Sequence, residues 1–235
     1  MTSRTHVIFA ALFAVVATAG CSLAGDGGKA GELGNGGFYF SCEDAVACDK
    51  YSNDASKFPS SVSLSSTFSV RFVPKTGSSG IVFNESAPDR GITIQPVGDF
   101  VSRGPKGLVA IKSGYATLAS RDAQGKLVDY VVVRVARPDA LVVYSADDSR
   151  SDPPRVESVD LTVGSRRAYR AFAQEKKADL AGSLQVEWTT EDPRVAVVEN
   201  TTDGKATISA RAAGTTNLVA VGGTFTQKIA IQVSQ

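Results

Sequence analysis

Three cysteines, at positions 21, 42 and 48, are the side chains of this sequence best suited to covalent chemistry. Exported proteins normally pair their cysteines, and the spacing between Cys42 and Cys48 allows a disulfide that closes a short loop. This pairing leaves Cys21 single. A metal site at Cys42 and Cys48 is disfavoured, because the spacing is not that of zinc ligands and the neighbouring carboxylates are hard ligands that match thiolates poorly.

Histidine and carboxylate side chains offer no catalytic pattern. The one histidine, His6, stands in the N-terminal segment, so the chain after it cannot build a Ser-His-Asp triad or a histidine-bearing metal site. Glu187 and Glu191 flank the single tryptophan, but Glu187 alternates with apolar neighbours and is expected to face solvent from a strand. We therefore expect no enzyme activity, no catalytic residues, no metal and no cofactor.

Residues 1–20 have the features of a secretory signal peptide, with an uncharged apolar run at 7–20 that is too short to span a bilayer. The sequence Thr18-Ala-Gly-Cys21 resembles the lipobox of bacterial lipoproteins, in which the cysteine is acylated, although leucine is usual at the position of Thr18. Ordinary cleavage after Ala19 also fits. Lipidation accounts for the single Cys21, so we expect a lipid anchor there. By the same resemblance, Ser22 implies transport to the outer membrane.

Glycine dominates residues 21–37, which we expect to form a flexible tether because they have little apolar surface to bury. The next segment, 38–57, joins the aromatic cluster Phe38 to Phe40 to the cysteine loop. The cluster either contacts a ligand or packs the cysteine loop onto the first domain, and packing is favoured.

Composition restricts the function classes further. Removing the signal peptide takes away one arginine and no acidic residue, so the remaining chain has 24 basic and 24 acidic side chains. Because the mature chain has no excess of basic charge, nucleic acid is not an expected partner.

The remaining length suits two domains, and abundant β-branched residues and turn signals predict an all-β fold. The expected domains are 58–146 and 155–235, and the Asp- and Pro-rich stretch 147–154 is the expected linker, where calcium binding stays open.

The stretch 184–198 predicts how the second domain is organised. Val186 and Trp188 alternate with polar residues, as in a strand with one buried face. A turn at Asp-Pro follows, and Val195 and Val197 continue as a second strand. We expect these four residues to lie in a core. Seven short strands in this domain predict a two-sheet sandwich, and a weaker copy of the stretch, at residues 81–92, predicts a similar first domain.

Several segments of the second domain resemble the bacterial Ig-like domain, group 2 family. The likeness is carried by Leu161–Gly164, Val186–Val198, Asp203–Gly204, Ala210–Thr216 and Ile229–Val233. It implies two tandem Ig-like β-sandwich domains, of which the first is divergent and lacks the tryptophan.

The family occurs in adhesins and other surface proteins and also as rigid spacers. Two functions are therefore expected: non-catalytic binding or adhesion by a lipid-anchored protein at the cell surface, or a structural role as a periplasmic spacer or accessory subunit. The partners are expected to be the membrane, through the lipid, and an unidentified envelope protein or glycan. An exposed aromatic patch, at Phe38 to Phe40 or at Tyr115 and Tyr130, would favour binding.

Overall fold

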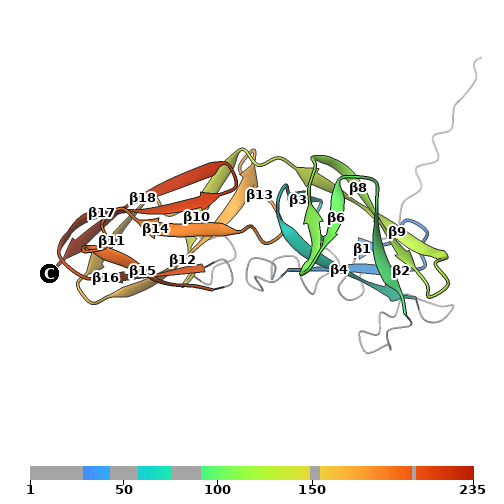
Figure 1. Cartoon of the computed structure of the whole chain (residues 1–235), viewed down its shortest axis with the longest axis horizontal. Helices are drawn as coiled ribbons and strands as arrows, with labels where there is room; N and C mark the ends of the chain where they lie inside the picture. Colours follow the sequence, from blue (N-terminus) through green and yellow to red (C-terminus); the bar gives the residue numbers. More distant parts are fainter. Residues whose placement is uncertain (1–28, 43–57, 76–90, 149–153, 203–204) are drawn as a thin grey trace, which may run out of the picture.

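The chain folds into two β-sandwiches placed end to end (Figure 1). The computed structural model describes residues 29–42, 58–75, 91–148, 154–202 and 205–235. All the regular elements in these ranges are strands, which confirms the expected all-β fold of two tandem sandwiches. None of the described residues forms a helix that could cross a membrane.

The first module consists of two facing sheets. One sheet has the order β1 (Lys29–Ala30), β2 (Gly36–Ser41), β4 (Thr67–Pro74), β7 (Gly107–Ala110) and β6 (Val101–Gly104). The other has the order β3 (Ser61–Ser63), β9 (Leu127–Ala136), β8 (Gly114–Arg121) and β5 (Thr93–Val97). Neighbouring strands are antiparallel except for β3 and β9, which run parallel.

Alternation along β8 and β9 places one set of side chains in the first core. Val131, Val133 and Val135 point inward and are almost fully buried, as is Leu118 opposite Val131. The facing sheet contributes aromatic rings, with Phe40 and Phe68 stacked at a centroid distance of 5.5 Å. Each such side chain contributes about 1.5–3 kcal/mol through burial, which accounts for a stable module without a tryptophan.

Part of the expected tether belongs to the first module. Residues 29–37 include β1 and the start of β2, and β2 pairs with β4 along its whole length. Glycine is needed here for close packing. A Cβ on Gly36 would lie 2.3 Å from the Phe72 ring and from the Val73 carbonyl oxygen. The tether expectation therefore fails for residues 29–37, and residues 22–28 lie outside the described part.

The buried carboxylate of Asp129 holds the β1–β2 loop against β9. Its two oxygens accept hydrogen bonds from the Leu33 and Asn35 amides, both at 2.8 Å. The Asn35 side chain also donates to the Val128 carbonyl. A Cβ on Gly31 would lie 2.2 Å from the Asp129 carboxylate, so this glycine permits the close approach of the loop.

The second module has the same two-sheet construction. One sheet has the order β10 (Ala140–Ser145), β12 (Arg166–Glu175), β16 (Lys205–Ala210) and β15 (Ala196–Thr202), with β13 (Ala178–Asp179) also paired to β12. The other has the order β11 (Ser158–Thr162), β18 (Phe225–Ser234), β17 (Gly214–Gly222) and β14 (Val186–Thr190).

Trp188 lies in the second core with 5% of its surface exposed. Val186 and Val195 are half-buried and pack against this core. Val197 was expected in the core but lies outside the cluster, because Ala196 and Val198 occupy the inward positions of β15. Strands β14 and β15 belong to different sheets, so the turn between them carries the chain across the sandwich.

The boundary between the modules lies earlier than expected. Strand β10 pairs with β12 over its whole length, so residues 140–145 belong to the second module. The first module therefore ends with β9, and Arg137–Asp139 joins the two. The stretch 147–154, expected as the linker, instead connects β10 to β11 within the second module. Asp147 accepts a hydrogen bond from the Ala168 amide there, whereas Asp152 lies outside the described residues.

The cysteine predictions fall mainly on undescribed residues. Cys21 and Cys48 lie outside the described part of the chain, and the disulfide and the lipid anchor stay predictions. Cys42 is half-buried and packs against the first core.

Candidate binding face and module junction

Two of the aromatic side chains proposed from the sequence as ligand contacts lie on an open sheet surface. Phe38, Tyr39 and Phe40 are buried, as the packing interpretation requires. Tyr115, in contrast, has 69% of its surface exposed, and Tyr130 is half-buried on the next strand. The candidate binding site is therefore the outward surface of the sheet that carries Tyr115.

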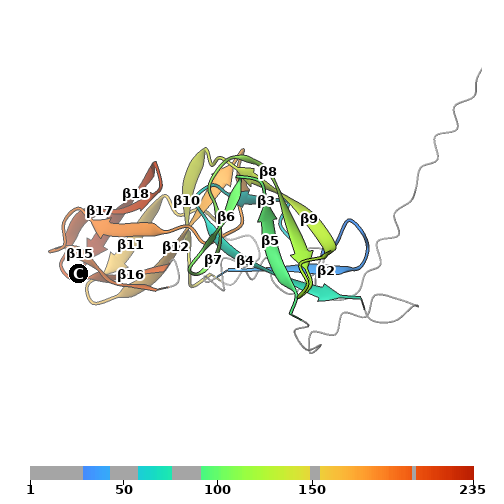
Figure 2. The same ribbon diagram turned by 45° about the vertical axis from the view of Figure 1, so that its right-hand side comes forward.

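Strand pairing defines this surface. Directly paired residues point to the same side of a sheet, so the outward positions can be read from the register. We name the resulting set the Tyr115 face. It comprises Thr93, Gln95 and Val97 from β5, Tyr115, Thr117, Ala119 and Arg121 from β8, and Tyr130, Val132 and Arg134 from β9. Figure 2 shows the three strands side by side.

The sequence produces this face because both sides of β8 and β9 carry apolar side chains. The inward set fills the core, and the outward set includes Val97, which is 48% exposed, and Val132, which is half-buried. Val97, Thr117 and Val132 form one row across the three strands. An apolar and aromatic outer surface is not needed to hold the sandwich together, which makes it a candidate contact surface.

Cations border the Tyr115 face. Arg121 and Arg134 point outward from its strands, and the Lys29 ammonium donates to the Val132 carbonyl oxygen at the edge of β9. The strands of the face contribute no outward carboxylate among the positions named above.

Arg134 connects the face to the second module. Its guanidinium donates two hydrogen bonds to the Glu175 carboxylate, at 2.6 and 2.5 Å. The bonds from Arg134 hold the pKa of Glu175 below its ordinary value, and the same pair raises the pKa of Arg134. Tyr115 is close enough to Arg134 to add to this increase. A ligand on Tyr115 would therefore lie beside the seam between the modules.

Main-chain hydrogen bonds also cross the junction. The Ser63 amide donates to the Ala181 carbonyl at 2.8 Å, and the Ala181 amide donates to the Ser61 carbonyl at 3.2 Å. Thr67 and Ser183 exchange a second pair of bonds, at 2.9 and 2.8 Å. Because Ser63 and Thr67 belong to opposite sheets of the first module, the second module is attached to both.

A small apolar cluster fills the junction behind these bonds. It consists of Ala136, Ala173 and Leu180, with Leu184 packed against them. A hollow of about 370 Å³ lies beside it, with Leu64 and Phe225 among its lining residues. Buried contacts, main-chain bonds and the Arg134–Glu175 pair together favour a stiff connection between the modules over a freely jointed one.

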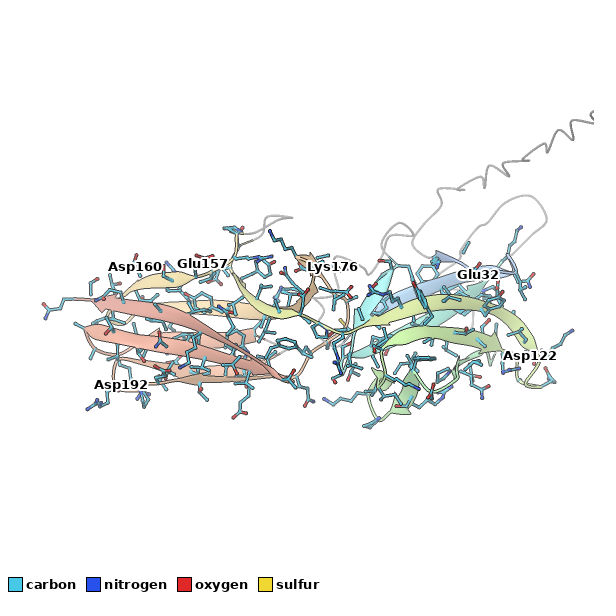
Figure 3. All side chains as sticks on the ribbon, turned by 90° about the horizontal axis from the view of Figure 1, so that it is seen from above. Glu32, Asp122, Glu157, Asp160, Lys176 and Asp192 are labelled. Carbon is cyan, nitrogen blue, oxygen red and sulfur yellow. The ribbon has the colours of Figure 1, made fainter. Side chains whose placement is uncertain are left out.

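The turn between β12 and β13 reaches the junction from the second module. Lys176 and Lys177 both have positive φ, 51° and 69°, as a tight hairpin turn requires. The Lys176 amide donates to Asp139 at 2.7 Å, which fixes the turn to the connecting segment. Figure 3 shows Lys176 at the junction, far from Asp160 and Asp192 at the other end of the second module.

A polar network supports the base of this turn. Gln174, which is 2% exposed, donates to the Tyr144 hydroxyl at 3.0 Å and to the Asp179 carboxylate at 2.6 Å. Arg155 donates to the Gln174 amide oxygen at 2.6 Å. Burial, followed by the charge of Asp179, raises the pKa of the Tyr144 hydroxyl.

A second hollow, of about 450 Å³, lies at the outer end of the second module and is bordered by carboxylates. Glu191 accepts hydrogen bonds from Lys228 at 2.6 Å and from Asn217 at 2.7 Å. The Arg194 guanidinium forms an ion pair with the Asp192 carboxylate, with 2.8 Å between Nη2 and Oδ2. These bonds lower the pKa of both carboxylates, so the groups are already satisfied by neighbours. In the described ranges, no cluster of His, Cys, Asp or Glu is arranged to hold a metal ion.

Comparison with known proteins gives only distant structural likenesses. Neither a protein-family profile nor a curated protein sequence matches this chain. Among solved structures it is similar to domains 4 and 5 of the S-layer protein SbsC, with 16% identity over 72% of this chain and 82% of that one, and a TM-score of 0.33.

It is also similar to the Yersinia pseudotuberculosis adhesin InvE, with 14% identity over 76% of this chain and 57% of InvE, and a TM-score of 0.31. The D00-D0 domain of intimin gives 14% identity over 84% of this chain and 100% of that domain, with a TM-score of 0.29. These scores are too low to transfer a function.

Sequence reasoning found Tyr115 and Tyr130 but missed the residues around them. The Arg134–Glu175 pair joins positions 41 apart in the sequence, and no local pattern connects them. Alternation in β9 did contain the signal for Val132 and Arg134, since both occupy outward positions between the core valines.

Proposed function

We propose that this chain is a lipid-anchored cell-envelope protein whose tandem Ig-like modules act in non-catalytic binding or adhesion at the cell surface. The observation that carries the proposal is the Tyr115 face, where the exposed Tyr115 and Val97 and the half-buried Val132 share one open sheet surface. Tyrosine and arginine are enriched where proteins contact partners. The resemblance of the second module to the bacterial Ig-like group 2 family agrees with this role.

The lipid anchor is the second part of the proposal. We expect acylation of Cys21 and retention at the outer membrane. Cys21→Ala should move the chain from the membrane fraction to the soluble fraction, as measured by immunodetection after fractionation. Persistence of the variant in the membrane fraction would refute the anchor.

Binding at the surface can be tested with the purified mature chain, made without its lipid. Intact cells of the producing organism that lack the gene are mixed with the chain, and the bound fraction is measured. Tyr115→Ala should reduce binding strongly, whereas Val163→Ala, which shortens a 45% exposed side chain in the second module, should not. Equal binding of both variants and the unchanged chain would overturn the assignment of the face.

A role as a periplasmic spacer or accessory subunit is the second candidate. The stiff junction favours it, because main-chain bonds tie the second module to both sheets of the first. Protease treatment of intact cells separates the two roles. Loss of the chain while a periplasmic control survives supports surface binding, and protection until the outer membrane is permeabilised supports the spacer.

A further inference from the structure

We propose that the end of the first module opposite the junction rests on the lipid surface, with the exposed side chains of Leu33 and Leu127 inserted among the lipid head groups. This inference rests on the lipid anchor at Cys21 in the proposed function. It goes beyond the anchor, because it assigns a second contact with the membrane to the folded protein itself.

Leu33 and Leu127 are exposed at the same end of the first module. Leu33 has 51% of its surface exposed, and Leu127 has 40%. The loop that carries Leu33 lies against the start of β9, since the Leu33 amide donates to Asp129 at 2.8 Å. The Asn35 side chain donates to the carbonyl of Val128, the residue that follows Leu127. Neither leucine belongs to the first core, which leaves both available for a contact outside the sandwich.

Hydrogen bonds order the two loops before any contact forms. The loop with Leu33 is fixed to the buried Asp129 carboxylate through two main-chain amides. In the turn before Leu127, the Asp122 carboxylate accepts a hydrogen bond from the Lys126 amide at 2.8 Å. Because the backbone of both loops is already ordered, inserting the leucines into a lipid surface costs little conformational entropy.

The distance to Cys21 restricts which part of the chain can meet the lipid. Eight residue steps separate Cys21 from Lys29, so an acylated Cys21 lies within about 28 Å of the start of β1. Lys29 pairs with Phe38, two residues after the start of β2, and lies about 7 Å from the end that carries Leu33. The ten-residue strand β18 makes the second module about 34 Å long, and this module extends away from β1 (Figure 1). Its outer end therefore lies too far from Lys29 to stand on the lipid.

The small area of the contact favours lipid over a protein partner. Two half-exposed leucines supply far less than the roughly 800 Å² on each partner that a stable protein interface needs. A lipid surface does not need a large contact here, because the anchor holds the module beside it at a high effective concentration. Burial of the two apolar side chains then decides which end of the protein faces the membrane.

Exposed charges at this end are of both signs. Among the described residues there, Lys75 and Lys126 stand beside Glu32 and Asp122 (Figure 3). Such a surface suits zwitterionic head groups, and we expect no requirement for anionic lipid. Vesicles of phosphatidylcholine are therefore the appropriate probe.

The test places single tryptophans on the full chain, purified with its native lipid and reconstituted into phosphatidylcholine vesicles whose acyl chains carry bromine, a fluorescence quencher. Trp188→Phe removes the native fluorophore and serves as the background. Leu33→Trp and Leu127→Trp should lose fluorescence relative to vesicles without bromine, and their emission should shift to shorter wavelength. The matched control is Val163→Trp, at a 45% exposed position at the outer end of the second module, which should do neither. Thermal unfolding of each variant confirms that it is folded.

A second variant tests whether the leucines cause the contact. Adding Leu33→Asp to the Leu127→Trp chain should reduce the quenching at position 127, because a carboxylate resists insertion into lipid. Unchanged quenching would contradict the role of Leu33. The mass of the N-terminal peptide shows separately whether Cys21 carries a lipid.

Equal quenching at positions 33, 127 and 163 would overturn the contact. Quenching of Tyr115→Trp as strong as that of Leu33→Trp would also overturn it, because the chain would then lie flat on the lipid. In both cases, a lipid on the Cys21 peptide leaves the proposed function intact. A Cys21 peptide without lipid would instead overturn the anchor and this contact together.

Discussion

Replacing Trp188 provides a quantitative test of the second core. The side chain is 5% exposed and lies opposite the fully buried Ala220 on β17. Truncating a buried tryptophan to alanine costs about 3–5 kcal/mol, because the removed atoms leave a cavity. The indole N–H, however, is buried without a hydrogen-bond partner among the described residues. Removing an unpaired donor recovers about 1 kcal/mol or more, so we expect Trp188→Ala to destabilise the module by about 3 kcal/mol.

Trp188→Phe is the matched variant. It keeps an aromatic ring in the core and removes the unpaired N–H, so we expect a change within about 1 kcal/mol of zero. The two variants together separate the effect of volume from the effect of the polar atom. A destabilisation by phenylalanine as large as that by alanine would show that the indole N–H makes a hydrogen bond that stabilises the fold.

The assay is urea unfolding of the mature chain followed by far-UV circular dichroism, since both variants lack the tryptophan fluorescence. With a urea m-value of about 1.5 kcal/mol/M for a module of this size, a loss of about 3 kcal/mol lowers the midpoint by about 2 M. The transition of the first module serves as the internal reference. An unchanged midpoint for Trp188→Ala would refute the placement of Trp188 in the core.

Two further predictions concern the N-terminal loop and the junction. Gly31→Ala should destabilise the first module by about 1–3 kcal/mol, because the new Cβ would collide with the Asp129 carboxylate; an unchanged melting temperature would contradict this packing. Glu175→Gln should lower the unfolding free energy at pH 7 by about 0.5–1 kcal/mol, since solvent partly screens the pair with Arg134. Because the folded pKa of Glu175 is lowered, its contribution is present above the ordinary carboxyl pKa and is lost as the pH falls through the lowered value. The difference between wild type and variant should therefore begin to shrink below about pH 4, and a constant difference down to pH 3 would be inconsistent with this pair.

Local alternation predicted the strands well where one face is buried. Trp188, which alternates with polar neighbours in the sequence, lies inside the second core as expected. Alternation predicted the wrong face for Val197. Because Val195 lies in the turn before β15, counting every second residue from it selects the outward positions of the strand.

Long-range pairing explains the remaining differences. Composition alone cannot distinguish a glycine that makes the backbone flexible from one that lets neighbouring atoms approach the backbone closely. Gly31 and Gly36 are of the second kind. No local pattern assigns strand β10 to a module, because only its partner, β12, determines which one it joins. The candidate site was partly predictable, since Tyr115 and Tyr130 are recognisable aromatics, but Val97, Thr117 and Val132 come together in one row only through strand register.

The hydrogen bonds between Asp129 and the β1–β2 loop have a mechanical consequence for a protein tethered at its N-terminal end. A pull between that end and a ligand on β8 would first load the pairing of β1 with β2 and the bond from Glu32 to Tyr130, and then the bonds that hold Leu33 and Asn35 to Asp129. The ladder between β2 and β4 would carry the load next. The second module would lie outside this load path, so tension would open the N-terminal hairpin while leaving the Trp188 sandwich folded.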